Sequence, residues 1–231
     1  MKFQHIFFDL DRTLWDFESN SFDTLVELFQ QFDLQKLGIP FAKDFIEKYQ
    51  INNENLWDKY RKGSITKDIL RDLRFHITLE EFGIIDKDLS SKLGDFYVTN
   101  SPKKTKLFPY SIPILKYLIK KGYHLHIITN GFQEVQIIKL EYSSLISFFK
   151  EIITSEAAGV KKPNSKIFQY ALDKANAQIE SSIMIGDDLA VDIIGAKDFG
   201  MSQIYFNPNR LIHHEDIYYE INCLNQLREI L

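Results

Sequence analysis

Short apolar runs recur along the chain, and polar or acidic residues close each of them. Runs of this kind are typical of strands buried in a parallel sheet, where both faces of each strand are covered. The runs span residues 3–8, 123–129, 149–154, 182–186 and 202–206. We therefore expect a parallel sheet whose first strand is separated from the others by a long stretch of chain.

Helical patterns lie between the later runs. In residues 113–121, 165–176 and 189–199 the apolar positions recur at the spacing of one helix face. Gly122 directly follows the first of these segments, where a glycine C-cap is expected. This alternation of strand and helix predicts an α/β fold with a doubly wound, Rossmann-like parallel sheet.

Residues 16–100 break the alternation. They are rich in Leu, Phe, Glu and Lys at helical spacing and contain no convincing buried strand. Stretches such as FDTLVELFQQFDLQKL predict amphipathic helices. We therefore predict an α/β core domain formed by residues 1–15 and 101–231, and an inserted helical cap domain formed by residues 16–100.

The composition indicates a globular protein, because 45% of the 231 residues are hydrophobic, which suffices for a full core. The single cysteine, Cys223, has no partner for an intrachain disulfide. The N-terminal apolar stretch is too short for a signal peptide, and no run is long enough to cross a bilayer. The net charge of -4 does not favour binding to a nucleic-acid polymer. We expect a cytoplasmic protein without a membrane or nucleic-acid partner.

Two acidic residues, Asp9 and Asp11, follow the first predicted strand. Side chains two residues apart share a face of an extended backbone. Ligands of open α/β sheets bind at the carboxyl ends of the strands, so both carboxylates can face one crevice. A lone Asp-x-Asp-x-Thr is nevertheless a weak signal, because acids after strands more often begin turns or cap helices.

Candidate phosphate ligands follow the second and third predicted strands. Thr129 offers a hydroxyl, and backbone amides from Asn130 onward can face an anion. Lys162 precedes Pro163, which favours an extended conformation for the lysine and lets it point into a crevice as a positive charge. Taken singly, an ordinary strand-to-turn junction is the better explanation of Thr129 and Asn130, and most lysines on a protein surface are merely solvated.

Three more carboxylates, Asp187, Asp188 and Asp192, follow the fourth predicted strand. Capping of the next helix explains Asp188, but it does not explain Asp187 and Asp192 as well.

The combination of these features indicates a metal site. Asp9, Asp11 and Asp187 are expected to crowd at one edge of the sheet, where their repulsion raises the carboxylate pKa values. Mg²⁺ relieves such repulsion, because it takes carboxylates, waters and a substrate phosphate in octahedral geometry. Thr129 and Lys162 then supply donors for the phosphoryl oxygens.

Four features have now been described: the Asp9–Asp11 pair, Thr129, Lys162 and the acids of residues 187–192. In this order along the chain, they resemble the signature motifs of the haloacid dehalogenase superfamily. The helical insert resembles the first type of cap domain in that superfamily. Residues 8–17, 55–60 with Gly63, and 128–132 further resemble the pyrimidine 5'-nucleotidase subgroup. Arg12 is a departure, since the wider superfamily often has glycine at this position.

The resemblance implies a magnesium-dependent phosphatase that acts on a small phosphomonoester. Asp9 is the implied nucleophile, which forms an aspartyl-phosphate. Asp11 is the implied general acid and then the general base. Lys162 is implied as catalytic, and it binds phosphate together with Thr129 and Asn130.

The implied metal ligands are Asp9, Asp11 through its backbone carbonyl, and Asp187. Asp192 is expected to hold metal-bound water or to orient Lys162. Asp188 has the weakest claim among the acids.

For the nucleotidase subgroup the implied substrate is a pyrimidine nucleoside 5'-monophosphate. Trp57, Tyr60 and Arg74 are the cap residues that we expect to contact it. The alternative is that they belong to the core of the cap, as a Trp and a Tyr three residues apart on a helix usually do.

Other functions remain open on the sequence alone. A phosphatase of sugar phosphates or other small metabolites would use the same core residues, and so would a phosphomutase. A haloacid dehalogenase also uses an Asp nucleophile, but Asp11 argues against it. A phosphoacceptor receiver domain combines acids with a Thr and a Lys, yet it is shorter and lacks the insert.

Overall fold

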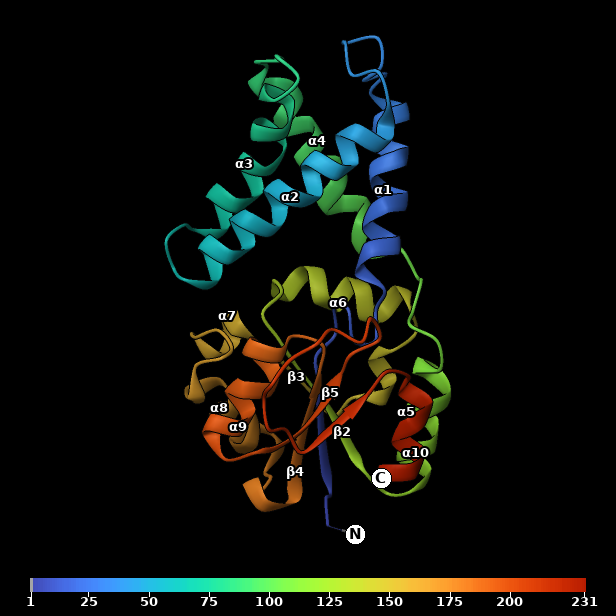
Figure 1. Ribbon diagram of the computed structural model, residues 1–231, viewed down its shortest axis with the longest axis vertical. Helices are drawn as coiled ribbons and strands as arrows, with labels where there is room; N and C mark the ends of the chain where they lie inside the picture. The colour runs from blue at the N-terminus through green and yellow to red at the C-terminus, as the bar shows by residue number, and fades with distance from the viewer. Residues whose placement is uncertain (1) are drawn as a thin grey trace. The chain divides into compact units, whose positions relative to one another are not determined.

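The computed structural model describes residues 2–231, so only Met1 of the predicted core segment lies outside the described residues. The chain divides into two compact units. The first consists of Met1–Phe17 and Thr105–Leu231, and the second consists of Glu18–Lys104. The first unit contains the sheet, whereas the second is helical (Figure 1).

A six-stranded parallel sheet forms the first unit and confirms the predicted Rossmann-like fold. The strands are β1 His5–Phe8, β2 His124–Thr129, β3 Glu151–Thr154, β4 Ser182–Gly186, β5 Ser202–Phe206 and β6 Tyr219–Ile221. They lie in the order β3-β2-β1-β4-β5-β6. Phe8 at the end of β1 lies opposite Ile127 of β2 and Ile185 of β4. The residues that follow these three strands therefore meet at one edge of the sheet.

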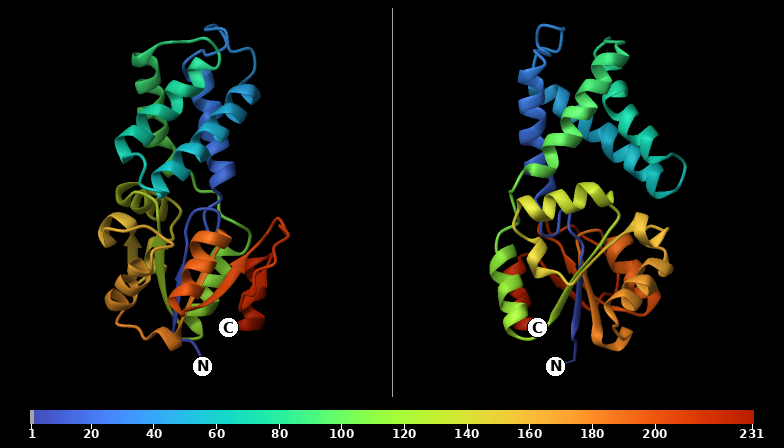
Figure 2. Two further views of the ribbon diagram at one scale, coloured as in Figure 1. Left: turned by 60° about the vertical axis from the view of Figure 1, so that its left-hand side comes forward. Right: turned by 180° about the vertical axis from the view of Figure 1, so that it is seen from behind.

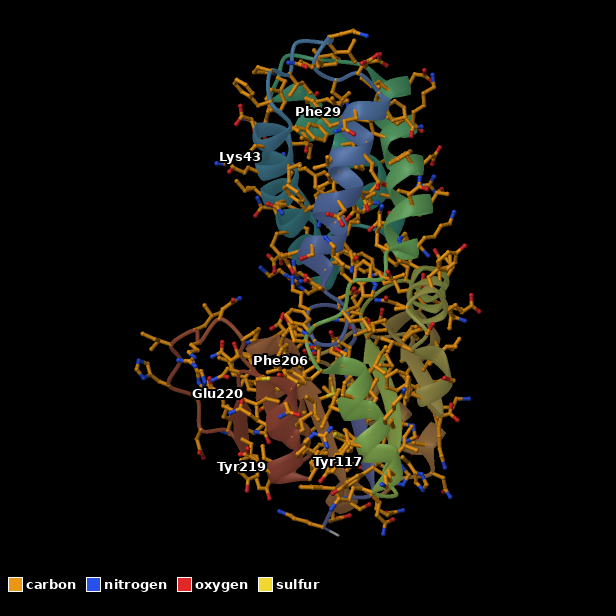
Figure 3. The ribbon with its side chains drawn as sticks, turned by 90° about the vertical axis from the view of Figure 1, so that its right-hand side faces the viewer. Phe29, Lys43, Tyr117, Phe206, Tyr219 and Glu220 are labelled. Atoms are coloured by element: carbon orange, nitrogen blue, oxygen red, sulfur yellow. The ribbon has the colours of Figure 1, made fainter. Side chains whose placement is uncertain are left out.

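The sequence pattern missed β6. Tyr219 and Glu220 are exposed, and only Ile221 of this strand is buried. The strand pairs with β5 alone and forms an edge of the sheet (Figure 3). A three-residue edge strand with one buried side chain contains no apolar run by which a sequence could reveal it.

Helices cover both faces of the sheet. The α-helices of the first unit are α5 Ser111–Lys120, α6 Gln133–Tyr142, α7 Ser155–Ala158, α8 Ser165–Ala175, α9 Gly195–Phe199 and α10 Leu227–Ile230. Three 3-10 turns accompany them: η2 Ile146–Phe148, η3 Ile179–Ser181 and η5 Leu224–Gln226. The segment η4, Leu189–Ile194, is a π-helix that leads directly into α9. The helix predicted over residues 189–199 therefore begins in a wider winding.

Successive residues of a strand point to opposite faces of the sheet. Phe8 joins the buried cluster that contains Leu115 of α5, and its neighbour Phe7 joins the cluster that contains Phe168 of α8. Figure 2 shows α5 and α10 on one side of the sheet and α8 and α9 on the other. Burial on both faces explains why the strands appear in the sequence as unbroken apolar runs.

Four helices form the second unit and confirm that the insert is helical. They are α1 Phe17–Gln31, α2 Ala42–Arg61, α3 Lys67–Glu80 and α4 Lys87–Asn100, and the 3-10 turn η1 Ser101–Lys103 follows them. Their apolar faces form a separate core that includes Phe29, Phe45 and Phe75. Phe29 points into this core, whereas Lys43 projects from the surface (Figure 3).

Polar side chains fix where two of these helices begin. Thr66 Oγ1 accepts a hydrogen bond from Ile69 N at the start of α3, and Asp86 Oδ1 accepts one from Leu89 N at the start of α4. Within residues 2–231, no helix combines the length and the apolar character that a bilayer span requires.

Candidate active site

Asp9 lies directly after the central strand β1. Its backbone N–H donates to Ile185 O of β4 at 2.8 Å, so the sheet geometry continues for one residue beyond the strand. The residue is only 8% exposed. A carboxylate this deeply buried requires a charged or hydrogen-bonding partner if it is to stay ionised.

Lys162 is that partner. Its Nζ donates to Asp9 Oδ1 at 2.6 Å and to Ile128 O at 2.7 Å, and it lies 2.7 Å from Asp192 Oδ1. Burial acts to lower the pKa of Lys162, but Asp192 and Asp9 outweigh this effect, so the pKa of Lys162 is raised. Lys162 is therefore held as a fixed positive charge beside Asp9.

Asp9, Asp187 and Asp192 form a compact acidic group. One carboxylate oxygen from each lies within 4.8 Å of the other two. Thr13 Oγ1 donates to Asp187 Oδ1 at 2.9 Å and fixes that side chain. The third carboxylate of the group is that of Asp192. The sequence predicted Asp11 as a metal ligand through its backbone carbonyl, and that role stays a prediction.

The acidic group carries more negative charge than Lys162 offsets. Burial raises the pKa of Asp9 to about 7, although Lys162 opposes the rise. Burial, followed by repulsion from Asp9 and Asp192, raises the pKa of Asp187 well above its ordinary value. Burial also raises the pKa of Asp192 against the effect of Lys162. A hard divalent cation fits this all-oxygen set of ligands, because it stabilises the charged forms.

Asp188 caps the helical segment η4. Its Oδ1 accepts hydrogen bonds from Ala190 N at 3.1 Å and from Val191 N at 3.0 Å. Its backbone N–H donates to Asp192 Oδ2 at 3.2 Å. Helix capping thus accounts for the Asp188 side chain, while its backbone helps to place Asp192.

The Thr129 hydroxyl lies at the end of β2. Its Oγ1 accepts hydrogen bonds from Gly131 N at 3.0 Å and from Gln136 Nε2 at 2.9 Å. A hydroxyl has two acceptor lone pairs and one proton, so these two bonds leave the proton to be donated. Thr129 is therefore set up as a donor to an anion.

Asn130 holds the backbone of Lys162. Its Oδ1 accepts from Lys162 N at 2.8 Å, and its Nδ2 donates to Lys162 O at 3.0 Å. Because both ends of the side-chain amide are used in this way, the group that Asn130 has left for a phosphate is its backbone N–H.

Asp11 contacts two residues that the sequence analysis did not single out. Lys139 Nζ donates to Asp11 Oδ1 at 2.6 Å, and Gln136 Nε2 donates to Asp11 Oδ2 at 2.8 Å. Both residues lie on the buried face of α6. Gln136 and Lys139 are three residues apart, so they lie on one side of the helix. A pair of polar residues on the buried side of a helix is the signal that could have identified them as candidate site residues.

Two residues beside the site, Gly131 and Arg12, occupy positions where glycine is favoured. A Cβ on Gly131 would lie 1.7 Å from Gln136 Nε2, so glycine is required there by the close approach of that amide. Arg12 has a φ of 64°, in the left-handed region that favours glycine. The Arg12 guanidinium packs 4.8 Å from the centre of the Phe17 ring.

The three predicted specificity residues lie in the second unit. The rings of Trp57 and Tyr60 meet edge-on at 5.6 Å between centroids. Arg74 is 6% exposed, and its guanidinium lies 4.9 Å from the centre of the Tyr97 ring. Tyr60 and Arg74 are buried, whereas Trp57 is half-buried, and contact of the three residues with a substrate stays a prediction.

Comparisons with known proteins agree with this geometry. The sequence profile of the haloacid dehalogenase-like hydrolases matches residues 3–200. Pyrimidine 5'-nucleotidase YjjG from Escherichia coli is 31% identical over 234 residues, covering 100% of this chain and 99% of YjjG. Glyceraldehyde 3-phosphate phosphatase from Methanothermobacter thermautotrophicus is 32% identical over 98% of both chains.

A solved structure is also similar to this chain over its full length. The crystal structure of the HAD-hydrolase YfnB from Bacillus subtilis bound to magnesium has a TM-score of 0.88 and is 28% identical. The alignment covers 100% of this chain and 99% of YfnB. The fold, the family match and the phosphatases among the relatives lead to one conclusion: the chain belongs to the haloacid dehalogenase-like hydrolase family, as a hydrolase of phosphoric monoesters.

Proposed function

We propose that this phosphatase is magnesium-dependent and hydrolyses pyrimidine nucleoside 5'-monophosphates through a phosphoenzyme on Asp9. The observation that carries the proposal is the buried contact of Lys162 Nζ with Asp9 Oδ1 at 2.6 Å, inside a group of three carboxylates. A lysine and a second cation beside one carboxylate suit a nucleophile that has to approach a negatively charged phosphate.

Asp9 attacks in the first half-reaction. A bond forms between an Asp9 carboxylate oxygen and phosphorus while the ester P–O bond breaks. The leaving oxygen keeps the electron pair of that bond and takes a proton from the Asp11 carboxyl group. Lys162 and the Thr129 hydroxyl bind the equatorial phosphoryl oxygens, where charge has to be stabilised.

Water attacks phosphorus in the second half-reaction. Asp11, ionised after giving up its proton, takes a proton from the water, and the bond between Asp9 and phosphorus breaks. The ester and one water have then become an alcohol and phosphate. The acidic group of Asp9, Asp187 and Asp192, together with the Asp11 carbonyl, would hold Mg²⁺, which would supply positive charge beside the phosphoryl group.

The choice of substrate rests on similarity along the full chain. YjjG, a pyrimidine 5'-nucleotidase, matches both units of the present protein. A second candidate is a small sugar phosphate, because the archaeal glyceraldehyde 3-phosphate phosphatase also matches nearly the whole chain, at 32% identity.

A substrate panel tests the proposal. Phosphate release is measured from pyrimidine and purine nucleoside monophosphates and from small sugar phosphates, with Mg²⁺ or with EDTA. We expect many turnovers per chain, the highest kcat/KM for pyrimidine monophosphates, and loss of activity with EDTA. Steady release without a sugar bisphosphate excludes a phosphomutase. Preference for sugar phosphates would reject the nucleotidase and leave the phosphatase, whereas full activity in EDTA would reject the role of magnesium.

A further inference from the structure

Lys139 has a buried ammonium group, and Asp11 is its ion-pair partner. The Lys139 side chain is 6% exposed, and its Nζ lies 4.4 Å from the centre of the Trp15 ring. An apolar side chain would fill this position without the cost of burying an ammonium group. The Trp15 ring face offsets part of that cost, but the only carboxylate bonded to Lys139 among the described residues is that of Asp11, at 2.6 Å.

Gln136 links Asp11 to the phosphate-binding residue Thr129. It is fully buried, and its Nε2 donates to both Asp11 Oδ2 and Thr129 Oγ1. Both hydrogens of the amide are therefore used, and they fix the distance between the two groups. Together with Lys139, Gln136 gives each oxygen of the Asp11 carboxylate a donor of its own, which restrains rotation of that group.

We propose that Lys139, assisted by Gln136, is a positioning residue that orients the Asp11 carboxylate for hydrolysis of the phosphoenzyme. The inference rests on the proposed function. In this step the water oxygen bonds to phosphorus, the Asp9–phosphorus bond breaks with its electrons returning to Asp9, and one water proton passes to Asp11. A carboxylate fixed on both oxygens keeps its remaining lone pairs in one direction, toward the attacking water.

Lys139→Met tests the proposal with para-nitrophenyl phosphate as the substrate. The nitrophenolate leaves without a proton donor, so kcat/KM, which reports steps up to its departure, does not depend on Asp11. The value of kcat includes hydrolysis of the phosphoenzyme and does depend on Asp11. We expect kcat to fall about 10–100-fold while kcat/KM stays within about threefold. A rapid burst of about one nitrophenol per chain should precede the slow steady state, because the phosphoenzyme accumulates.

Two variants serve as controls. Lys139→Arg keeps a charged donor for Asp11 and should recover most of kcat. Lys121→Met is the matched control, because Lys121 also lies over an aromatic ring, 5.5 Å from the centre of Tyr117, but is exposed. Its kcat, kcat/KM and burst should equal those of the wild-type protein.

Equal falls in kcat and kcat/KM without a burst would overturn the proposal, and so would an unchanged kcat. If Lys139→Met does not fold, as judged by circular dichroism, Lys139→Gln is measured in the same way. It keeps a neutral donor for Asp11 and should show the same pattern with a smaller fall in kcat. Failure of the wild-type protein to form a phosphoenzyme would instead reject the proposed function.

Discussion

A Cβ on Gly186 would lie 2.2 Å from Asp192 Oδ2, because the last residue of β4 packs directly against that carboxylate. The absence of a side chain at position 186 lets Asp192 approach the strand and place its Oδ1 2.7 Å from Lys162 Nζ. Glycine is required here by the close approach and not by backbone torsion. The position of the Lys162 ammonium beside Asp9 therefore depends on Gly186, although Gly186 has no side chain with which to contact Lys162.

Gly186→Ala should displace the Asp192 carboxylate and with it Lys162. A displacement of about 1 Å in Lys162, which we propose binds phosphate, can cost about 100-fold in rate, so we expect kcat/KM to fall by about that factor. The matched control is Gly94→Ala, where the nearest atom to the new Cβ is Arg71 O at an ordinary 3.8 Å. Equal kcat/KM values for the two variants would contradict this account.

Asp9→Asn should abolish turnover, because an amide does not form the phosphoenzyme. It should also stabilise the metal-free protein at pH 8. The pKa of Asp9 in the folded protein, about 7, is above its ordinary value of 3.8, so ionisation opposes folding as the pH rises through this interval. Thermal unfolding in EDTA should give a higher Tm for Asp9→Asn than for the wild type at pH 8, and nearly equal values near pH 4. A lower Tm for the variant at pH 8 would show that the pairing with Lys162 outweighs burial.

Mg²⁺ should raise the Tm of the wild-type protein, because a ligand that binds only the folded state stabilises it by mass action. The rise should be smaller for Asp187→Asn, which removes one charge from the acidic group. Asp173→Asn is the control, since Asp173 lies on α8 and pairs with Gln169. An equal rise in all three proteins would place the magnesium elsewhere.

His126 should make the protein sensitive to acid. Burial, with the nearby His5 and His124, lowers the pKa of His126 from 6.5 to about 3. Below pH 6.5 the unfolded chain binds a proton that the folded protein does not, so stability is lost as the pH falls from 6.5 toward 3. At pH 5 this loss amounts to about 2 kcal/mol, at about 1.4 kcal/mol for each pH unit.

His126→Phe should remove much of that loss, since Phe keeps an aromatic ring against Phe7, whose ring is stacked on His126 at 4.7 Å. Denaturant unfolding at pH 7 and pH 5 measures it as the difference in the free energy of unfolding. His214→Phe, at an exposed position, is the control. The prediction fails if the wild type and His126→Phe lose the same stability between the two pH values.

The strand ends that carry the candidate site could be predicted from the sequence, because a buried parallel strand appears as an apolar run and its end as the first acid or turn residue. Asp9 and Asp187 follow such runs directly, and Thr129 is the last residue of its run. β6 could not be predicted, because two of its three side chains are exposed. The π-helical winding of Leu189–Ile194 was also beyond reach, since its apolar spacing does not differ from that of an ordinary helix over so short a segment.

Local order along the chain thus determined the fold class, the helical insert and the residue types that meet at one edge of the sheet. Only the tertiary structure decided which carboxylates lie together and which side chains they contact. It grouped Asp192 with Asp9 and Asp187, and it paired Asp11 with Lys139 and Gln136. The physical reason is that electrostatic and hydrogen-bonded contacts depend on distances of a few ångströms between side chains far apart in sequence, and helical or strand periodicity does not encode such distances.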